Sequence, residues 1–220
     1  MARLLFEKTG NAVWISHLDL MRLFQRAFKR AGLPLTHTQG YNPRPSVSIA
    51  LPLSVGIESD CELLDFDLDG ETNCSCGEIQ DRLNAALVAG VRVLDVYENG
   101  RKIRDLTFLR CQVQLEYDNG IPEGCVDAIA ELFCRETLIV PKKGKNGPTE
   151  QDIIPMIKEM SVTAVDGNAI LLDSVICCQN PSLSPIQLAA AVNKFLPDCK
   201  PGFAKCRRLE LLDTQGKIFR

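Results

Sequence analysis

The chain has 220 residues, of which 45% are apolar and 24% charged, and its formal net charge is −3. This length allows one large domain or two small ones, and no apolar run approaches the roughly 20 residues that a membrane-spanning helix needs. The first ten residues, MARLLFEKTG, lack the apolar core of a signal peptide. We therefore expect a cytoplasmic protein that does not associate with membranes.

The first half of the chain predicts alternating strands and helices. The clearest element is a helix over 16–31, with Ser16 as N-cap, Asp19 three residues later and Gly32 just past its end. Leu20, Phe24 and Phe28 recur at helical spacing and predict its buried stripe. The other expected elements are strands in RLLFEKTG, SVSIALPLSVGI, CELLDFDLD and VRVLDVYEN, and a second helix in SCGEIQDRLNAAL.

The second half repeats this alternation less regularly. Its expected strands are LTFLRCQVQLEY, TLIVPKK, SVTAVDGNAILLDSVICC and CRRLELLD, and its expected helices are PEGCVDAIAELFCRE and SPIQLAAAVNKFL. The polar segment 141–151 is expected to be a loop. The order β-α-β-β-α-β is that of a ferredoxin-like unit. We therefore predict an α+β fold of two tandem ferredoxin-like units, residues 1–98 and 99–220, the second less regular.

Charge is unevenly distributed along the chain. Residues 1–50 carry seven Lys or Arg against two Asp or Glu, whereas residues 51–81 carry nine Asp or Glu and no Lys or Arg. Such asymmetry suggests one surface for a polyanion and another that repels it, although two solvated surfaces of opposite sign would give the same pattern.

The exposed face of the first helix concentrates the positive charge. Arg22, Arg26, Lys29 and Arg30 lie opposite the apolar stripe, and like charges at this spacing slightly destabilise a helix. This cost favours contact with a phosphate backbone, while a simply solvated face remains the alternative. The lysine-rich stretch 142–145 is a weaker candidate for a second phosphate contact.

The ten cysteines are expected to be reduced thiols, since no secretory signal accompanies them. There is no CxxC pair, and only His17 and His37 could add imidazole ligands. We therefore expect neither a metal site nor a cofactor in this chain. Trp14, the only tryptophan, is expected to anchor the core or a hinge.

The segment GYNPRP, residues 40–45, predicts a stiff turn that carries a cation. Pro43 and Pro45 fix their own backbone angles and hold Arg44 between them, and Asn42 can close an Asx-type turn. A preorganised arginine beside Tyr41 suits a phosphate or carboxylate contact. The alternative is a bulge at the start of an edge strand, where proline is tolerated.

The combination of SHLD at 16–19, a basic helix, GYNPRP and PLSVGIES at 52–59 resembles the radical-SAM-linked domain of unknown function. Members of that family commonly have His where this chain has Arg44. The resemblance implies a radical SAM protein as partner. It also makes RNA the favoured substrate, because such genes in some genomes lie near ribosomal-protein and ribonuclease genes. A radical SAM enzyme holds its iron–sulfur cluster with a three-cysteine motif that this chain lacks, so the partner would perform any radical chemistry.

Three functions are therefore considered. The first is a non-catalytic accessory protein that binds RNA or presents a substrate to the radical SAM partner. Its expected binding residues are Lys8, Ser16, His17, Arg22, Arg26, Lys29, Arg30, Tyr41, Asn42 and Arg44. The second is a docking module for the partner that does not bind nucleic acid. The third is a metal-independent endoribonuclease, with His17 as acid or base and Lys8 or an arginine stabilising the transition state.

Overall fold

The computed structural model describes residues 1–70, 74–144 and 147–220 and shows a mixed α+β fold. The chain divides into two compact units, Met1–Ile103 with Arg220 and Arg104–Phe219. Within the described residues, no helix has both the length and the apolar character needed to cross a membrane.

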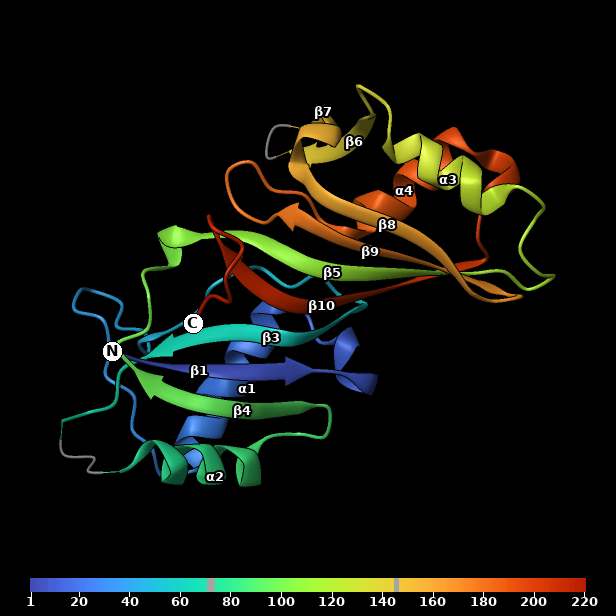
Figure 1. Cartoon of the computed structure of the whole chain (residues 1–220). Coiled ribbons are helices and arrows are strands. Elements are labelled where there is room, and N and C mark those ends of the chain that lie inside the picture. The colour runs from blue at the N-terminus through green and yellow to red at the C-terminus, as the bar shows by residue number, and fades with distance from the viewer. Residues whose placement is uncertain (71–73, 145–146) are drawn as a thin grey trace. The chain divides into compact units, whose positions relative to one another are not determined.

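In the first unit, two helices cover a four-stranded antiparallel sheet (Figure 1). Strand β1 pairs with β3 on one side and with β4 on the other, and β2 pairs with the far edge of β3. The spatial order is therefore β4-β1-β3-β2. The elements are β1 (Ala2–Lys8), α1 (His17–Arg30), β2 (Val47–Ile49), β3 (Ile57–Phe66), α2 (Cys76–Ala86) and β4 (Val91–Glu98).

Helix α1 begins and ends where its capping residues predict. The backbone N–H of Asp19 donates to Ser16 Oγ at 3.2 Å, which satisfies one of the free donors at the start of the helix. At the other end the N–H groups of Gly32 and Leu33 donate to the carbonyls of Lys29 and Phe28. This Schellman pattern needs a left-handed residue after the helix, and Gly32 supplies it with φ of 67°.

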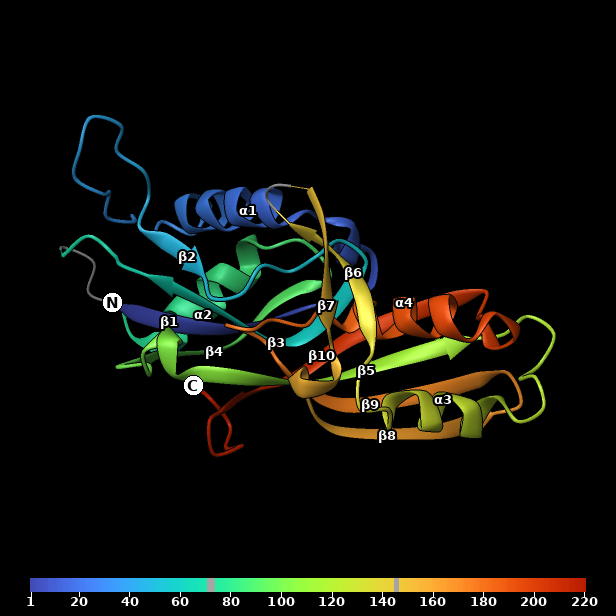
Figure 2. The ribbon, with the colours of Figure 1, turned by 90° about the horizontal axis from the view of Figure 1, so that it is seen from above.

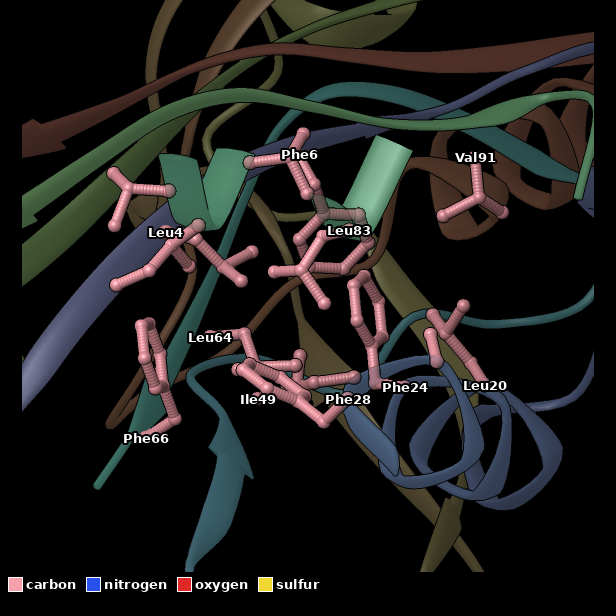
Figure 3. Close-up of a cluster of buried hydrophobic side chains, with 14 of the residues drawn as sticks. Leu4, Phe6, Leu20, Phe24, Phe28, Ile49, Leu64, Phe66, Leu83 and Val91 are labelled. Carbon is pink, nitrogen blue, oxygen red and sulfur yellow. The ribbon is translucent and has the colours of Figure 1, made fainter. Parts of the chain in front are cut away.

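The core of this unit lies between α1, α2 and one face of the sheet (Figure 3). Phe24 is fully buried, and its ring meets Phe6 of β1 edge-to-face with the centroids 4.7 Å apart. Phe28 packs on Phe66 of β3 with the two rings tilted by 47° and their centroids 4.9 Å apart. The predicted packing of α1 through Phe24 and Phe28 is therefore confirmed.

The extended segment after α1 pairs over a shorter length than its sequence suggests. Only Val47–Ile49 form a strand, and β3 begins at Ile57 rather than at Cys61. Between the two strands the chain still buries Leu51 and Leu53, so the apolar pattern reflects packing rather than strand pairing. Pro52 has no backbone N–H to contribute to a sheet.

The second unit has a four-stranded antiparallel sheet in the order β10-β5-β9-β8. Its elements are β5 (Leu106–Glu116), α3 (Cys125–Phe133), β6 (Ile139–Gly144), β7 (Gly147–Asp152), β8 (Ile157–Asp166), β9 (Ala169–Cys177), α4 (Pro185–Phe195) and β10 (Phe203–Asp213). Strands β6 and β7 pair only with each other. The expected strand TLIVPKK thus lies outside the main sheet, and much of the expected loop 141–151 is a second strand paired with it.

Candidate functional site on α1 and the following turn

Helix α1 presents its four expected cations to solvent, but on two sides. Arg22, Arg26, Lys29 and Arg30 are all exposed. Arg22 Nη1 lies 2.9 Å from Asp19 Oδ1, and Arg30 Nη2 donates to the carbonyl of Ala86, at the end of α2, at 2.6 Å. Arg30 thus contacts the end of α2 and Arg22 stays paired within α1, whereas Lys29 lines a cavity with the turn that follows α1.

The arginines line two hollows that share Arg30. One, of about 420 Å³, is lined by Arg22, Arg26 and Arg30 together with Asp19, Ile15, Leu23 and Val88. The other, of about 370 Å³, is lined by Arg30 and Arg82 with three alanines. We call the surface formed by Arg22, Arg26, Arg30 and Arg82 the arginine groove. Sequence reasoning missed Arg82, because its proximity to α1 depends on the contact between the two helices.

Lys29 lines a third cavity, of about 440 Å³, between α1 and the segment that leads to β2. Its apolar part is formed by Phe28, Leu33, Leu35, Pro34 and Pro45, and its polar part by Gln25, Lys29 and His37, with Gly32 completing the lining. We call it the α1–turn cavity. His37 was considered only as a metal ligand from the sequence, yet here it shares a cavity with Lys29.

The segment 36–46 forms the turn that the prolines predict. The N–H of Ser46 donates to the carbonyl of Thr36 at 2.7 Å, and that of Thr38 to Arg44 at 2.8 Å. The hydroxyl of Thr38 also accepts from the N–H of Arg44 at 3.1 Å. The loop projects beyond the end of α1 (Figure 2), and Tyr41, Asn42 and Arg44 are exposed on it. Thr38, rather than the expected Asn42, supplies this side-chain contact.

Acidic residues lie at the base of this turn. The N–H of Asp69 donates to the carbonyl of Pro34 at 2.9 Å, and Ser46 Oγ donates to Asp67 at 3.3 Å. Asp67 also lies 2.9 Å from the N-terminal ammonium of Met1, and this contact raises the pKa of that amine. The acidic stretch therefore borders the turn, and part of its charge is compensated locally.

Lys8 and Ser16 make contacts that support the start of α1. Lys8 is fully buried and its Nζ donates to the carbonyl of Ile15 at 2.9 Å, so it supports the entry into α1. The hydroxyl of Ser16 caps α1 and donates to Asp19 Oδ2 at 2.8 Å. That hydrogen bond is the main reason that the pKa of Asp19 lies below its usual range, and Arg22 adds to the effect.

His17 lies apart from the arginine groove. It starts α1, and at 3.6 residues per turn it points about 140° around the helix from Arg22. It is partly buried, and its Nδ1 is buried without a hydrogen-bond partner in the described part of the chain. His17 therefore lies off the face of α1 that carries Arg22.

Exposed apolar residues surround the start of α1. The exposed fractions of Trp14 and Leu18 are 66% and 67%, and that of Val55 is 45%. The Trp14 ring lies 3.7 Å from where a side chain on Gly56 would begin. The expectation that Trp14 anchors the core is therefore wrong, because its ring lies on the surface over a glycine.

Burial makes Cys111 and Cys206 poor candidates for a reactive centre. All ten are free, and burial raises the pKa of Cys111 to about 11 and that of Cys206 to about 12. Thiols of this kind stay protonated at neutral pH and are poor nucleophiles. No group of three or more His, Cys, Asp or Glu in the described ranges could hold a metal ion.

Comparisons with known proteins identify a family and solved structures of distant similarity. No curated protein matches the chain. A chain of a Cbf5–Nop10–Gar1 complex is similar over 96% of this chain and 48% of its own length, with 8% identity and a TM-score of 0.48. The chain thus spans about half the length of that protein.

An unknown protein from Galdieria sulphuraria is similar over 97% of both chains, with 12% identity and a TM-score of 0.26. Likenesses this weak carry no argument about function. A family model, in contrast, matches residues 2–185, which is most of the chain. The chain belongs to the family described as uncharacterized proteins conserved in bacteria, DUF2344.

Proposed function

We propose that each unit is ferredoxin-like. In the first unit the strand order β4-β1-β3-β2, with every pair antiparallel, is that of a split β-α-β arrangement. In the second unit β5, β8, β9 and β10 take the corresponding places, and the β6–β7 hairpin is an insertion before the second sheet strand. This assignment supports two tandem units.

We further propose that the chain is a non-catalytic accessory protein that binds RNA for a radical SAM enzyme. The observation that carries the proposal is the arginine groove, in which four arginines from two helices line adjoining hollows. Guanidinium groups suit phosphate because they offer several donors in a planar fork. A surface that gathers them is suited to a polyanionic backbone, whose contacts supply sequence-independent affinity.

The charge in the groove is largely available for a ligand. Among the described residues that line the two hollows, Asp19 is the one carboxylate, and it pairs with Arg22 while remaining exposed. Exposed ion pairs contribute little and are readily exchanged. A phosphate can therefore replace Asp19 as a partner of Arg22 at small cost.

The link to a radical SAM enzyme rests on the resemblance of the SHLD and GYNPRP segments to the radical-SAM-linked domain. In the proposed division of labour the partner performs the chemistry, and this chain holds the RNA. A metal-independent endoribonuclease has less support, because Lys8 is buried and His17 points to another side of α1 than Arg22.

Salt-dependent binding tests the proposal. Fluorescence anisotropy with a labelled single-stranded RNA, measured between low and physiological salt, should give a steep negative slope of log affinity against log salt. The double variant Arg22→Gln/Arg26→Gln should weaken binding and reduce that slope by about 1.4, roughly 0.7 for each lost phosphate contact. The charge-matched control is Lys158→Gln/Lys200→Gln in the second unit, which should leave the slope unchanged. Absence of binding at low salt, or an unchanged slope in the arginine variant, would refute RNA binding at the groove.

A docking module remains the second candidate, because Trp14, Leu18 and Val55 expose apolar surface at the start of α1. Exposed aromatic residues of this kind are common anchors in protein interfaces. If docking is the function, Trp14→Ala should abolish capture of the proposed radical SAM partner, and the interaction should respond weakly to salt. Retained capture by Trp14→Ala would exclude docking through this apolar patch.

A further inference from the structure

The α1–turn cavity is large enough for a small planar ligand. Its volume of about 440 Å³ falls within the roughly 300–1,000 Å³ typical of small-molecule sites. It opens between the second half of α1 and the chain segment 32–45, so both a helix and a stiff turn define it. It lies apart from the arginine groove, since only Lys29 among the four expected cations of α1 lines it.

The apolar walls of the cavity are held rigidly. Phe28 and Leu33 are fully buried and held by the helix end and the Schellman hydrogen bonds around Gly32, so the apolar surface open to a ligand is that of Pro34, Leu35 and Pro45. The rings of Pro34 and Pro45 add apolar surface that loses no side-chain entropy on binding. The backbone pairing of His37 with Pro45 holds the two sides of the turn together. Such walls favour a ligand with a flat, weakly polar ring over a flexible chain.

The polar part of the cavity favours an anion beside that flat ring. Lys29 and His37 both line it, and Gln25 adds an amide that can donate and accept. The lining residues, all in the described part of the chain, include no Asp or Glu. Asp67, at the nearby base of the turn, is engaged by Met1 and Ser46. An anionic group at Lys29 would therefore meet attraction without a directly opposing carboxylate in the cavity.

We propose that the α1–turn cavity binds one unpaired nucleotide, with its base against the apolar walls and its phosphate at Lys29 and His37. This inference rests on the proposed RNA binding and specifies which form of RNA the protein selects. Lys29 follows Arg26 by three residues, so the two cations are neighbours on the helix surface, about 5–6 Å apart at their Cβ atoms. A strand whose backbone follows the arginines can thus continue to Lys29 and place its next base in the cavity.

The proposal explains a selectivity that the groove alone cannot provide. Arginine contacts to phosphates do not depend on which bases are present. They also do not require the bases to be unpaired. A cavity for one base requires that the base be unstacked and unpaired, as in loops, bulges and single strands. The protein should therefore present accessible nucleotides, rather than paired ones, to its partner enzyme.

Mononucleotides provide the direct test. Uridine, cytidine, adenosine and guanosine 5′-monophosphates are titrated into the ¹⁵N-labelled full chain, with ribose 5-phosphate as the probe that lacks a base. We expect at least one nucleotide to shift the backbone amide signals of residues 25–37, and to bind about tenfold or more tightly than ribose 5-phosphate. Lys29→Gln should weaken that binding, whereas the charge-matched Lys158→Gln/Lys200→Gln in the second unit should leave it unchanged.

A variant that fills the cavity supplies the second test. Gln25 is partly exposed on α1, so Gln25→Trp can place an indole in the cavity without removing a core residue. It should abolish the mononucleotide shifts and lower affinity for single-stranded RNA about tenfold, while leaving affinity for a duplex unchanged. Gln25→Ala keeps the cavity open and should retain mononucleotide binding. If Gln25→Trp fails to fold by circular dichroism, Leu35→Phe fills the same cavity from its other side.

The outcomes separate this proposal from RNA binding at the groove. If the wild type binds no RNA but a mononucleotide still shifts residues 25–37, the groove proposal fails and the cavity remains a nucleotide site. If RNA binds through the arginines but no nucleotide shifts these residues, the cavity proposal is overturned. Equal affinity for ribose 5-phosphate and the nucleotides would also overturn it, because the cavity would then hold only a phosphate.

Discussion

Helices α1 and α3 occupy the same position in their units, each following the first strand, yet they present opposite chemistry to solvent. Each buries one apolar face, centred on Phe24 in α1 and on Ile129 in α3. The sequence of α1 carries four Lys or Arg, whereas that of α3 carries Asp127 and Glu131 and no cation. The buried face of such a helix is set by the sheet beneath it, but its outer face is free to differ. Function must therefore be argued from that outer face.

The segments that follow the two helices differ as well. After α1 the chain forms the proline-stiffened turn 36–46, which carries Arg44 and bounds the α1–turn cavity. After α3 it forms the β6–β7 hairpin, where Lys142 Nζ approaches the carbonyl of Ser182 at 3.5 Å. Lys145, the last residue of the lysine-rich stretch, lies outside the described residues. The binding features proposed here thus belong to the first unit.

The largest expected effect tests whether the buried faces of the two helices are equivalent. Phe24→Ala should lower the free energy of unfolding by about 3–5 kcal/mol, and Ile129→Ala by about 2–5 kcal/mol, because both side chains are fully buried. Urea unfolding followed by circular dichroism measures both. In native conditions Ile129→Ala should keep its RNA affinity. A loss below about 1 kcal/mol for Phe24→Ala would contradict the packing of α1 on Phe6.

The second prediction separates support of α1 from binding by α1. Lys8→Met should destabilise the protein by about 1–3 kcal/mol, because the buried carbonyl of Ile15 loses its donor. It should leave the salt slope of RNA binding unchanged, since Lys8 does not reach the surface. Unfolding and anisotropy on the same preparation measure the two effects. A reduced salt slope of RNA binding with unchanged stability would instead indicate that Lys8 contacts RNA.

Local signals predicted what is local in this fold. The limits of α1 follow from Ser16 and Gly32, and the capping box of α2 from Ser75 and Glu78, because each cap is satisfied within a few residues. The pairing of β6 with β7 could not be predicted from such local signals. Its charged and glycine-rich sequence resembles a loop, and strand pairing depends on the partner strand.

The candidate site was predictable only in part for the same reason. The cations of α1 and the turn at 40–45 were found from spacing and proline content. Arg82 and the α1–turn cavity were missed, because each arises where segments distant in sequence meet. The exposure of Trp14 was also unpredictable, since a single tryptophan is more often expected inside than on the surface.

The third prediction concerns the turn that distinguishes the first unit. Arg44→Ala should weaken RNA binding more than Arg22→Ala or Arg26→Ala alone, because the proline-held backbone of the turn has little entropy to lose on binding. Arg44→His should retain part of the affinity at pH 6 and less at pH 8, since an imidazole loses its positive charge between these values. Anisotropy at the two pH values measures this. Wild-type affinity in Arg44→Ala would show that the turn lies off the RNA path.

The smallest expected effect concerns Asp19, the carboxylate that pairs with Arg22 in the arginine groove. Its pKa lies below the usual range because the Ser16 hydroxyl donates to the carboxylate, and Arg22 contributes further. Since the folded-state pKa is depressed, the stabilisation from Asp19 is present at neutral pH. It is lost as pH falls below about 4 and through the folded value. Carbon-detected NMR titration of the Asp19 carboxyl group measures this directly.

The two causes of the Asp19 shift can be separated, and they bear on the groove. Ser16→Ala should return the pKa of Asp19 further toward its usual value than Arg22→Gln does, because the hydroxyl is the larger cause. Added salt should raise the pKa in the wild type by screening Arg22 and Arg26, and this effect should be smaller in Arg22→Gln, where only Arg26 of the two remains. If RNA displaces Asp19 from Arg22, bound RNA should raise the pKa of Asp19 in the same direction as salt. A pKa unchanged by saturating RNA would mean that the Asp19–Arg22 pair persists in the complex, and the phosphate path would then run over Arg26, Arg30 and Arg82 without Arg22.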